Sequence, residues 1–199
     1  MNLNNKTFCA EVISSNLGQV TIVAWQHDQP FAYGSLVAIE QSTKIIYAVI
    51  SGTMIGSDDP SRKPFAYKLS KEELAHQQPQ IFSVIQTTMT GMVVGYEQGD
   101  TICHMVAPEP AEIHSFVRPA TSQEVQRFVI KPTYLQLLFS ANSALNNVDE
   151  LLLALVRYLK SQSALSPSSL QDLVGTYSLL TGNDYRRLKL LLSRMQQLL

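Results

Sequence analysis

The sequence predicts an α+β chain in which an N-terminal β-barrel of about six strands, residues 1–118, precedes a C-terminal helical domain, residues 119–199. Two observations support this division. Up to about Val106 the apolar segments are rich in Val, Ile, Thr and aromatic residues and are separated by turn residues, as strands are. After Pro119 the apolar residues recur at helical spacing. The secondary structure is therefore expected to change class between these two positions.

Six segments of the first region are typical of strands, and several are apolar nearly throughout, so both of their faces are expected to be buried. Gly34 and Gly52 bracket the central pair, while Gly91 and Gly95 fall inside a run too long for one flat strand. Glycines at such places indicate a bulge or a corner, which favours a closed barrel over residues 6–107. The predicted strands are 8–14, 19–26, 35–40, 44–51, 81–97 and 101–106.

A polar segment, residues 56–80, interrupts these strands with three prolines and mixed charges. Ser70 and Glu73 have the spacing of a capping box, so we expect a surface loop that contains one short helix. Long loops in compact domains are often functional. An irregular barrel insertion without a ligand is an equal alternative.

The segment that follows the strands is expected to lead out of the barrel. Pro108 and Pro110 cannot donate ladder hydrogen bonds, and each restricts the residue before it. The chain should therefore leave the sheet there in an extended conformation. The apolar residues Ile113, Phe116 and Val117 should then pack against the barrel.

Capping signals begin each predicted helix of the second region. Between them the apolar residues repeat every three or four positions, as in helices that bury one face. The predicted starts are Thr121 with Glu124, Asn146 or Asn147, Ser166 with Pro167, and Asp184 after Gly182 and Asn183. A helical bundle is therefore expected after the barrel.

The last predicted helix carries an apolar stripe that something must cover. Either the preceding helices or a second subunit could do so. Only 16% of the residues are charged, against roughly 25% in typical soluble domains, which favours some burial between subunits and makes a homo-oligomer plausible. The candidate interface residues are Tyr185, Leu188, Leu192, Met195 and Leu199.

Composition points to a cytoplasmic protein. Cys9 and Cys103 lie in apolar, strand-like contexts without a partner at metal-binding spacing, which is typical of reduced core thiols. The longest uninterrupted apolar stretch, residues 151–156, is far shorter than the roughly 20 residues of a membrane-spanning helix. We therefore expect no membrane partner.

No recognised motif predicts catalysis, a cofactor or a metal site. The nucleotide-binding pattern GxxxxGK[ST] is absent, and His27, His76, His104 and His114 match no metal-ligand spacing. Adjacent strand residues point to opposite faces, so Cys103 and His104 should not form a catalytic pair. The paired carboxylates lie in hydrophilic, loop-like sequence, where solvated charges are expected; they are Asp58 with Asp59, Glu72 with Glu73, and Glu109 with Glu112.

Basic residues of the last helix lie off its apolar stripe and are candidate phosphate contacts. No aromatic residue alternates with them to stack on bases, and cations near a helix C-terminus are favoured by the helix dipole in any case. A structural role is therefore the main expectation, with nucleic-acid binding as the alternative. The residues are Arg186, Arg187, Lys189 and Arg194.

The succession PFAYGSLVAIE, IIYAVISG, GMVVGY and APEPAEIHSFVRPATSQEV resembles the HAS-barrel, the N-terminal barrel of HerA-type DNA-translocating ATPases, which is related to the barrel of rotary ATP synthase catalytic subunits. The resemblance covers roughly residues 6–125. It implies a barrel fold and a role in assembly through ring contacts. The matching positions are Gly34, Gly91, Gly95, Pro108, Pro110 and Val117.

HerA-type proteins continue into a nucleotide-binding ATPase domain, whereas this chain continues into about 75 residues of helical sequence. The resemblance therefore does not imply ATPase activity, since a fold alone does not define a function. We expect a non-catalytic module that binds another protein, or copies of itself, through its barrel and helical surfaces. The alternative is a nucleic-acid-associated accessory protein that works beside a separate ATPase or nuclease.

Overall fold

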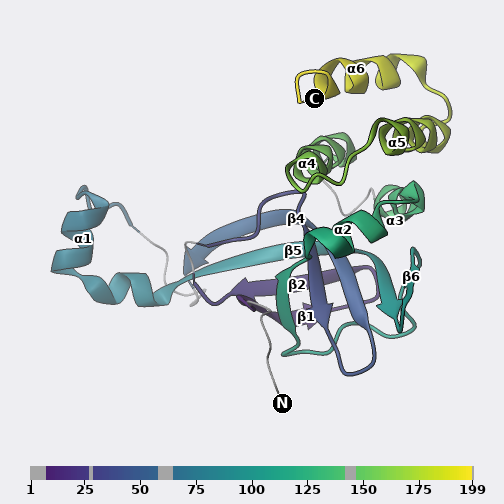
Figure 1. The fold of residues 1–199 in the computed structure, drawn as a ribbon. Helices are drawn as coiled ribbons and strands as arrows, with labels where there is room; N and C mark the ends of the chain where they lie inside the picture. Colours follow the sequence, from purple (N-terminus) through teal and green to yellow (C-terminus); the bar gives the residue numbers. More distant parts are fainter. Residues whose placement is uncertain (1–7, 27–28, 58–64, 142–146, 199) are drawn as a thin grey trace.

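The computed structural model describes residues 8–26, 29–57, 65–141 and 147–198. An antiparallel β-barrel is followed by a layer of helices (Figure 1), which confirms the predicted fold class. The strands are β1 (Ala10–Ser15), β2 (Gln19–Ala24), β3 (Leu36–Glu40), β4 (Ile45–Ser57), β5 (Ile85–Gln98), β6 (Thr101–Cys103) and β7 (Phe116–Pro119).

Six of these strands close the barrel in the order β2, β1, β7, β3, β4 and β5, and β5 pairs with β2 to complete the ring. The short β6 is added at the side of β5. Side chains of alternate positions fill the interior, as the strict alternation of buried and half-buried residues along β2 illustrates. The interior is apolar and includes Ala10, Val12, Ile22, Val37, Ile39, Ile46, Ala48, Ile50, Met89 and Val117.

The middle strands are buried on both faces, as their apolar sequences predicted. Val37 and Ile39 of β3 point into the barrel, whereas Leu36 and Ala38 belong to the core that the barrel shares with the helices. The sequence of β3 therefore lacks polar alternation because a helix covers its outer face.

Two irregularities in the pairing of β4 with β5 lie beside the predicted glycines. The register shifts between Tyr47 and Ala48, opposite Gly95, and again between Ile50 and Gly52, opposite Gly91. A Cβ atom on Gly95 would lie 2.5 Å from the carbonyl oxygen of Cys103. The prediction of bulges in this long run is confirmed, and Gly95 allows β6 to approach β5.

As predicted, the chain leaves the sheet around Pro108 and Pro110, since residues 104–115 belong to no strand. The structure corrects the prediction that this segment leads out of the barrel, because the chain then returns to the sheet. Residues 116–119 form β7, which pairs with β1 and β3 and closes the ring. Val117 is fully buried in the interior, but Ile113 and Phe116 are 49% and 43% exposed, so the expectation that they pack against the barrel was wrong. A strand of four residues that contains an arginine and ends in proline shows too little alternation to be recognised.

The predicted caps are present. Ser70 and Glu73 form a capping box on α1 (Lys71–Gln77), and Thr121 with Glu124 forms another on α2 (Ser122–Phe128). Asn147, Ser166 and Asp184 cap the later helices through their side chains. The remaining elements are η1 (Pro79–Val84), η2 (Pro132–Tyr134), α3 (Leu135–Ser140), α4 (Val148–Ser161), α5 (Pro167–Leu180) and α6 (Tyr185–Met195). The sequence did not predict η2 and α3.

The helices pack on the barrel through α4. Eight residues of α4 are buried, and the turn that enters β3 touches the helix backbone. Gly34 has a φ of +82°, and a Cβ atom there would lie 2.6 Å from the carbonyl carbon of Ala154. Gly34 therefore serves both the turn and the contact with α4. In the part of the chain that the structure describes, no helix is long and apolar enough to cross a membrane.

Strands β4 and β5 continue past the barrel as a two-stranded ribbon that carries η1 and α1 (Figure 1). We call this projection the arm; its described parts are residues 52–57 and 65–87. Opposite Gly52–Met54 the β5 residues also pair with β2, so the arm has only two strands from Ile55 onward. The sequence predicted a surface loop with one helix here. The structure adds that the two strands extend to lift this loop away from the barrel.

Candidate functional site

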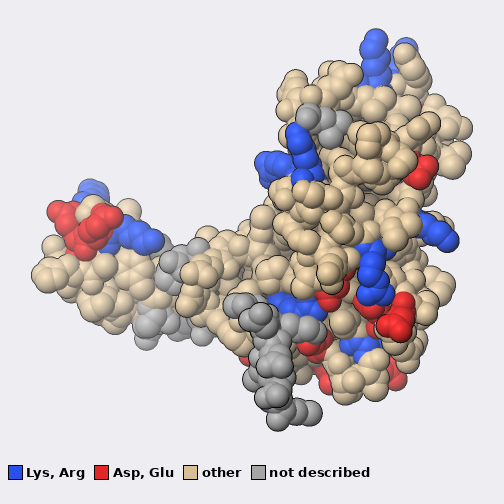
Figure 2. Space-filling model, viewed as in Figure 1, with Lys and Arg blue, Asp and Glu red and all other residues tan. Residues whose placement is uncertain are grey.

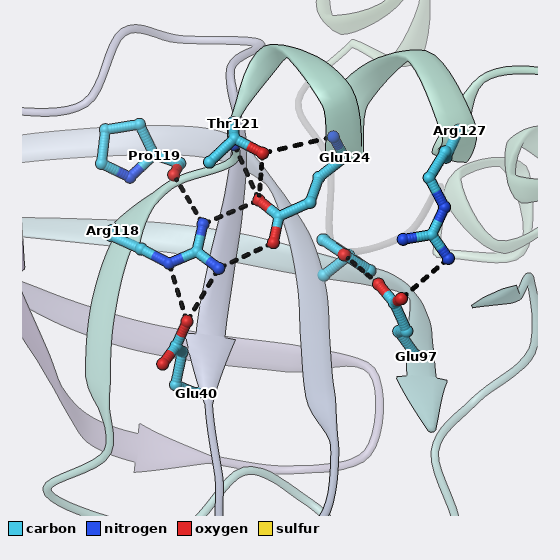
Figure 3. A network of polar contacts seen from close by, with 8 residues as sticks. Glu40, Glu97, Arg118, Pro119, Thr121, Glu124 and Arg127 are labelled. Carbon is cyan, nitrogen blue, oxygen red and sulfur yellow. Dashed lines mark hydrogen bonds and ion pairs between the residues drawn. The ribbon is translucent and has the colours of Figure 1, made fainter. Parts of the chain in front are cut away.

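The best-connected polar group of the structure lies where β7 meets α2. Arg118 is only 2% exposed. Its Nε donates to Glu40 at 2.8 Å, and its two terminal nitrogens donate to the two carboxylate oxygens of Glu124, each at 2.7 Å (Figure 3). Burial alone would raise the pKa of Glu124, but the hydrogen bonds from Arg118 and Thr121 lower it below its usual range. The arginine therefore helps to hold the Glu124 carboxylate ionised.

A second polar cluster, at the same end of the barrel, joins α2 to β4 and β5. The Tyr47 hydroxyl donates to Glu97 at 2.6 Å, and Arg127 of α2 lies 2.8 Å from the other oxygen of the same carboxylate (Figure 3). Burial, followed by the bond to Glu97, raises the pKa of the Tyr47 phenol. We call the two clusters together the junction: Glu40, Tyr47, Glu97, Arg118, Glu124 and Arg127. Each of its carboxylates is paired with an arginine. This arrangement suits ion pairs that hold α2 on the barrel.

The described histidines and cysteines are dispersed. His104 lies among the rings of Phe128 and Tyr134, and its Nδ1 is 2.6 Å from the Thr133 hydroxyl. Burial lowers the pKa of His104, and the nearby charge of Lys131 adds to this effect. Neither Cys9 nor Cys103 forms a disulfide among the described residues.

The other candidates for chemistry lie at the surface. His114 pairs with Glu11 beside a hollow of about 340 Å³ that Glu112 also lines. Glu109 pairs with Lys44 at 3.3 Å. His76, Glu72 and Glu73 belong to α1, where Glu73 caps the helix. His27, Asp58 and Asp59 lie outside the described residues. Over the described ranges, no three His, Cys, Asp or Glu residues gather as a metal site.

The four basic residues of α6 separate into two pairs. Arg187 binds Asp149 of α4 through two nitrogens, each at 2.8 Å, and Arg194 binds Glu150. Arg186 and Lys189 are exposed. Half of the predicted phosphate contacts are thus used to hold α6 on α4, which leaves a smaller basic surface for the nucleic-acid alternative.

The predicted interface stripe of α6 is largely used inside the chain. Met195 is buried, and Leu188 and Leu192 pack partly against the helical core. Tyr185, by contrast, is 72% exposed. Leu199 lies outside the described residues. The preceding helices therefore cover most of the described stripe, and the role of Tyr185 between subunits remains a prediction.

The arm exposes large apolar residues that nothing in the described chain covers. Met54 and Ile55 of β4 are 67% and 61% exposed, and Phe65 is 68% exposed. Met54 and Ile55 are adjacent on a strand and so point to opposite faces of the ribbon. None of the residues of α1 is buried. Met54, Ile55 and the helix at the end of the ribbon are thus accessible to a partner, whereas Thr87 of β5 is buried.

The charges of the arm gather at α1, as Figure 2 shows, while β4 contains no charged residue over its whole length. Sequence reasoning missed this site because β4 was predicted to end at Ser51. The uncharged run TMIG that follows Gly52 is the signal that could have revealed the longer strand.

No family model matches this chain, and no curated protein matches it.

Proposed function

We propose that this chain is a non-catalytic protein-binding or assembly module with a HAS-barrel-like body, and that the arm is the element that contacts the partner. The observation that carries this proposal is the exposure of Met54, Ile55 and Phe65 on a projection whose helix buries no residue. Several large exposed apolar residues on one projection are more typical of an interaction site than apolar residues scattered singly over the surface.

The energetics of the arm favour a partner. A two-stranded ribbon is marginally stable in water unless a third strand or a helix packs on it, and a helix of seven residues is too short to be stable alone. Covering an exposed apolar side chain is worth about 25 cal/mol per Å². A protein that packs on the arm would supply the contacts that the barrel does not.

The remaining features agree with an assembly role. The closed barrel, the bulges at Gly91 and Gly95, and the helix that follows Pro119 support the proposed HAS-barrel relationship. Each junction carboxylate is paired with Arg118 or Arg127, and Glu97 also accepts from Tyr47, which supports a structural use of these charges.

Site-specific photo-crosslinking tests this proposal. A photoreactive amino acid placed at Phe65, in the cell of origin and at native abundance, should give one or a few discrete crosslinked products. The same group at Leu179, which is 73% exposed on α5, is the matched control and should give none of them. If the two positions give the same products, the arm is not the contact element.

A further inference from the structure

The outer edge of β4 differs from the other sheet edges of the molecule. Within the barrel, β3 pairs with β4 from Ile45 to Val49, and Ser35 and Gly34 extend this contact to Ile50. Beyond Ile50 the inner edge of β4 pairs with β5 as far as Ser57, while no described residue pairs with its outer edge over residues 52–56. Every second residue there directs its backbone N–H and C=O groups outward.

Proteins usually protect an open edge with charges, proline or a very short strand. The edge strand β6 follows this rule, since it has only three residues. By contrast, β4 has 13 residues without a charge or a proline. Its projecting half is therefore able to accept a further strand.

We propose that residues 52–56 of β4 pair antiparallel with the same residues of a second copy, so that the two sheets join through their open β4 edges. This inference rests on the proposed function and names the partner. A strand that pairs with itself about a two-fold axis matches its own donors and acceptors. The absence of charge from β4 means that a second copy brings no repulsion to the edge.

The space around the open edge of β4 is large enough for a second copy of the chain to approach. The arm projects to one side of the barrel, clear of α4, α5 and α6 (Figure 1), so two ribbons are able to meet ahead of the two barrels. Pairing would also place the uncovered Met54 beside Met54 of the second copy, with Ile55 opposite Thr53. Beyond Met54 the ribbon of one chain has only two strands, and the second copy supplies the further strand that such a ribbon needs for stability.

Charge substitutions at Met54 test the pairing, because a two-fold axis through the middle of the segment places this residue next to its counterpart. Sedimentation velocity over a wide concentration range should show that the intact chain dimerises. Met54→Lys and Met54→Glu should each raise the dimer dissociation constant at least about tenfold, which corresponds to about 1.4 kcal/mol. An equimolar mixture of the two variants should recover dimers, because unlike charges then meet across the axis.

Leu179→Lys, which adds the same charge on exposed α5, is the control and should leave the dissociation constant unchanged. A chain that stays monomeric throughout, or a Met54→Lys variant that dimerises as well as the intact chain, would overturn the inference. The proposed function has a separate readout. If the crosslinks from Phe65 lead to a different protein while the intact chain is monomeric, the arm binds a partner but the partner is not a second copy.

Discussion

The junction and the arm differ in which side chains they bury: the junction buries charged groups, and the arm exposes apolar groups. In the junction, Arg118 is buried, yet its charge meets two carboxylates and a carbonyl oxygen. In the arm, Met54 and Phe65 are apolar, yet they lie in solvent. Buried charges with complete hydrogen bonding fix how α2 sits on the barrel, whereas exposed apolar groups contribute nothing to this fold. Under the proposed function, the junction serves folding and the arm serves contact.

The largest effect is expected from breaking the junction at Arg118. Arg118→Met leaves Glu40 and Glu124 without their cation, and removing one partner of a buried ion pair costs roughly 3 to 5 kcal/mol. Denaturant unfolding monitored by circular dichroism measures this loss. The triple variant Arg118→Met, Glu40→Gln, Glu124→Gln should recover a large part of it. A small loss in the single variant would mean that solvent reaches the cluster.

A somewhat smaller effect is expected where the barrel touches α4. Gly34→Ala places a methyl group 2.6 Å from the backbone of Ala154 and strains a positive φ, so we expect a loss of about 2 to 3 kcal/mol in the free energy of unfolding. Gly175→Ala is the matched control, since a Cβ atom there meets nothing within 4 Å. This helical substitution should instead stabilise the protein by about 0.5 to 1 kcal/mol.

The helix caps and the turn at Gly34 could be predicted because each depends on residues that are close together in the sequence. Capping boxes such as Thr121 with Glu124 depend on residues three positions apart, so the sequence states them directly. Gly34 was expected as a turn before β3 for the same reason. The contact of Gly34 with Ala154 joins segments that are far apart in the chain, so no local sequence pattern predicts it.

The features that the sequence analysis missed depend on contacts between residues that are far apart in the chain. β7 is recognisable only from its pairing with β1 and β3, and Arg118 only from Glu40 and Glu124, which lie on other elements. The arm was missed in part because Gly52 was taken as the end of a strand. In the structure it lies at a register shift, and β4 continues beyond it.

Acidification should weaken the junction region through His104. Because burial lowers the pKa of this imidazole, the folded protein favours its neutral form, and the unfolded chain takes up a proton first as the pH falls. The contribution of His104 is therefore complete above the ordinary imidazole pKa of about 6.5 and declines below it, by at most about 1.4 kcal/mol per pH unit.

Unfolding free energies measured between mildly acidic and neutral pH test this slope. His104→Gln should flatten the pH dependence, while His76→Gln on the exposed helix α1 should leave it unchanged. Equal slopes in the intact protein and in His104→Gln would show that the imidazole does not titrate differently in the folded state.

The smallest effect on folding is expected in the arm itself. Phe65→Ser removes a ring that is 68% exposed and touches Tyr67, so the free energy of unfolding should change by no more than about 0.5 kcal/mol. The same variant should lose the partner contact that the arm provides. A stability loss comparable to that of Gly34→Ala would show that Phe65 packs on the body of the protein.

Removal of the arm beyond Met54 tests most directly whether the junction serves folding and the arm serves contact. Met54 and Thr88 lie opposite each other in the register of β4 and β5, so an Asn-Gly turn can replace the residues between them with a two-residue hairpin. The decisive quantity is the free energy of unfolding of this shortened chain relative to the intact chain, both measured as monomers. We predict a difference within about 1 kcal/mol; a loss of several kcal/mol would show that the arm is part of the fold and contradict its assignment to contact.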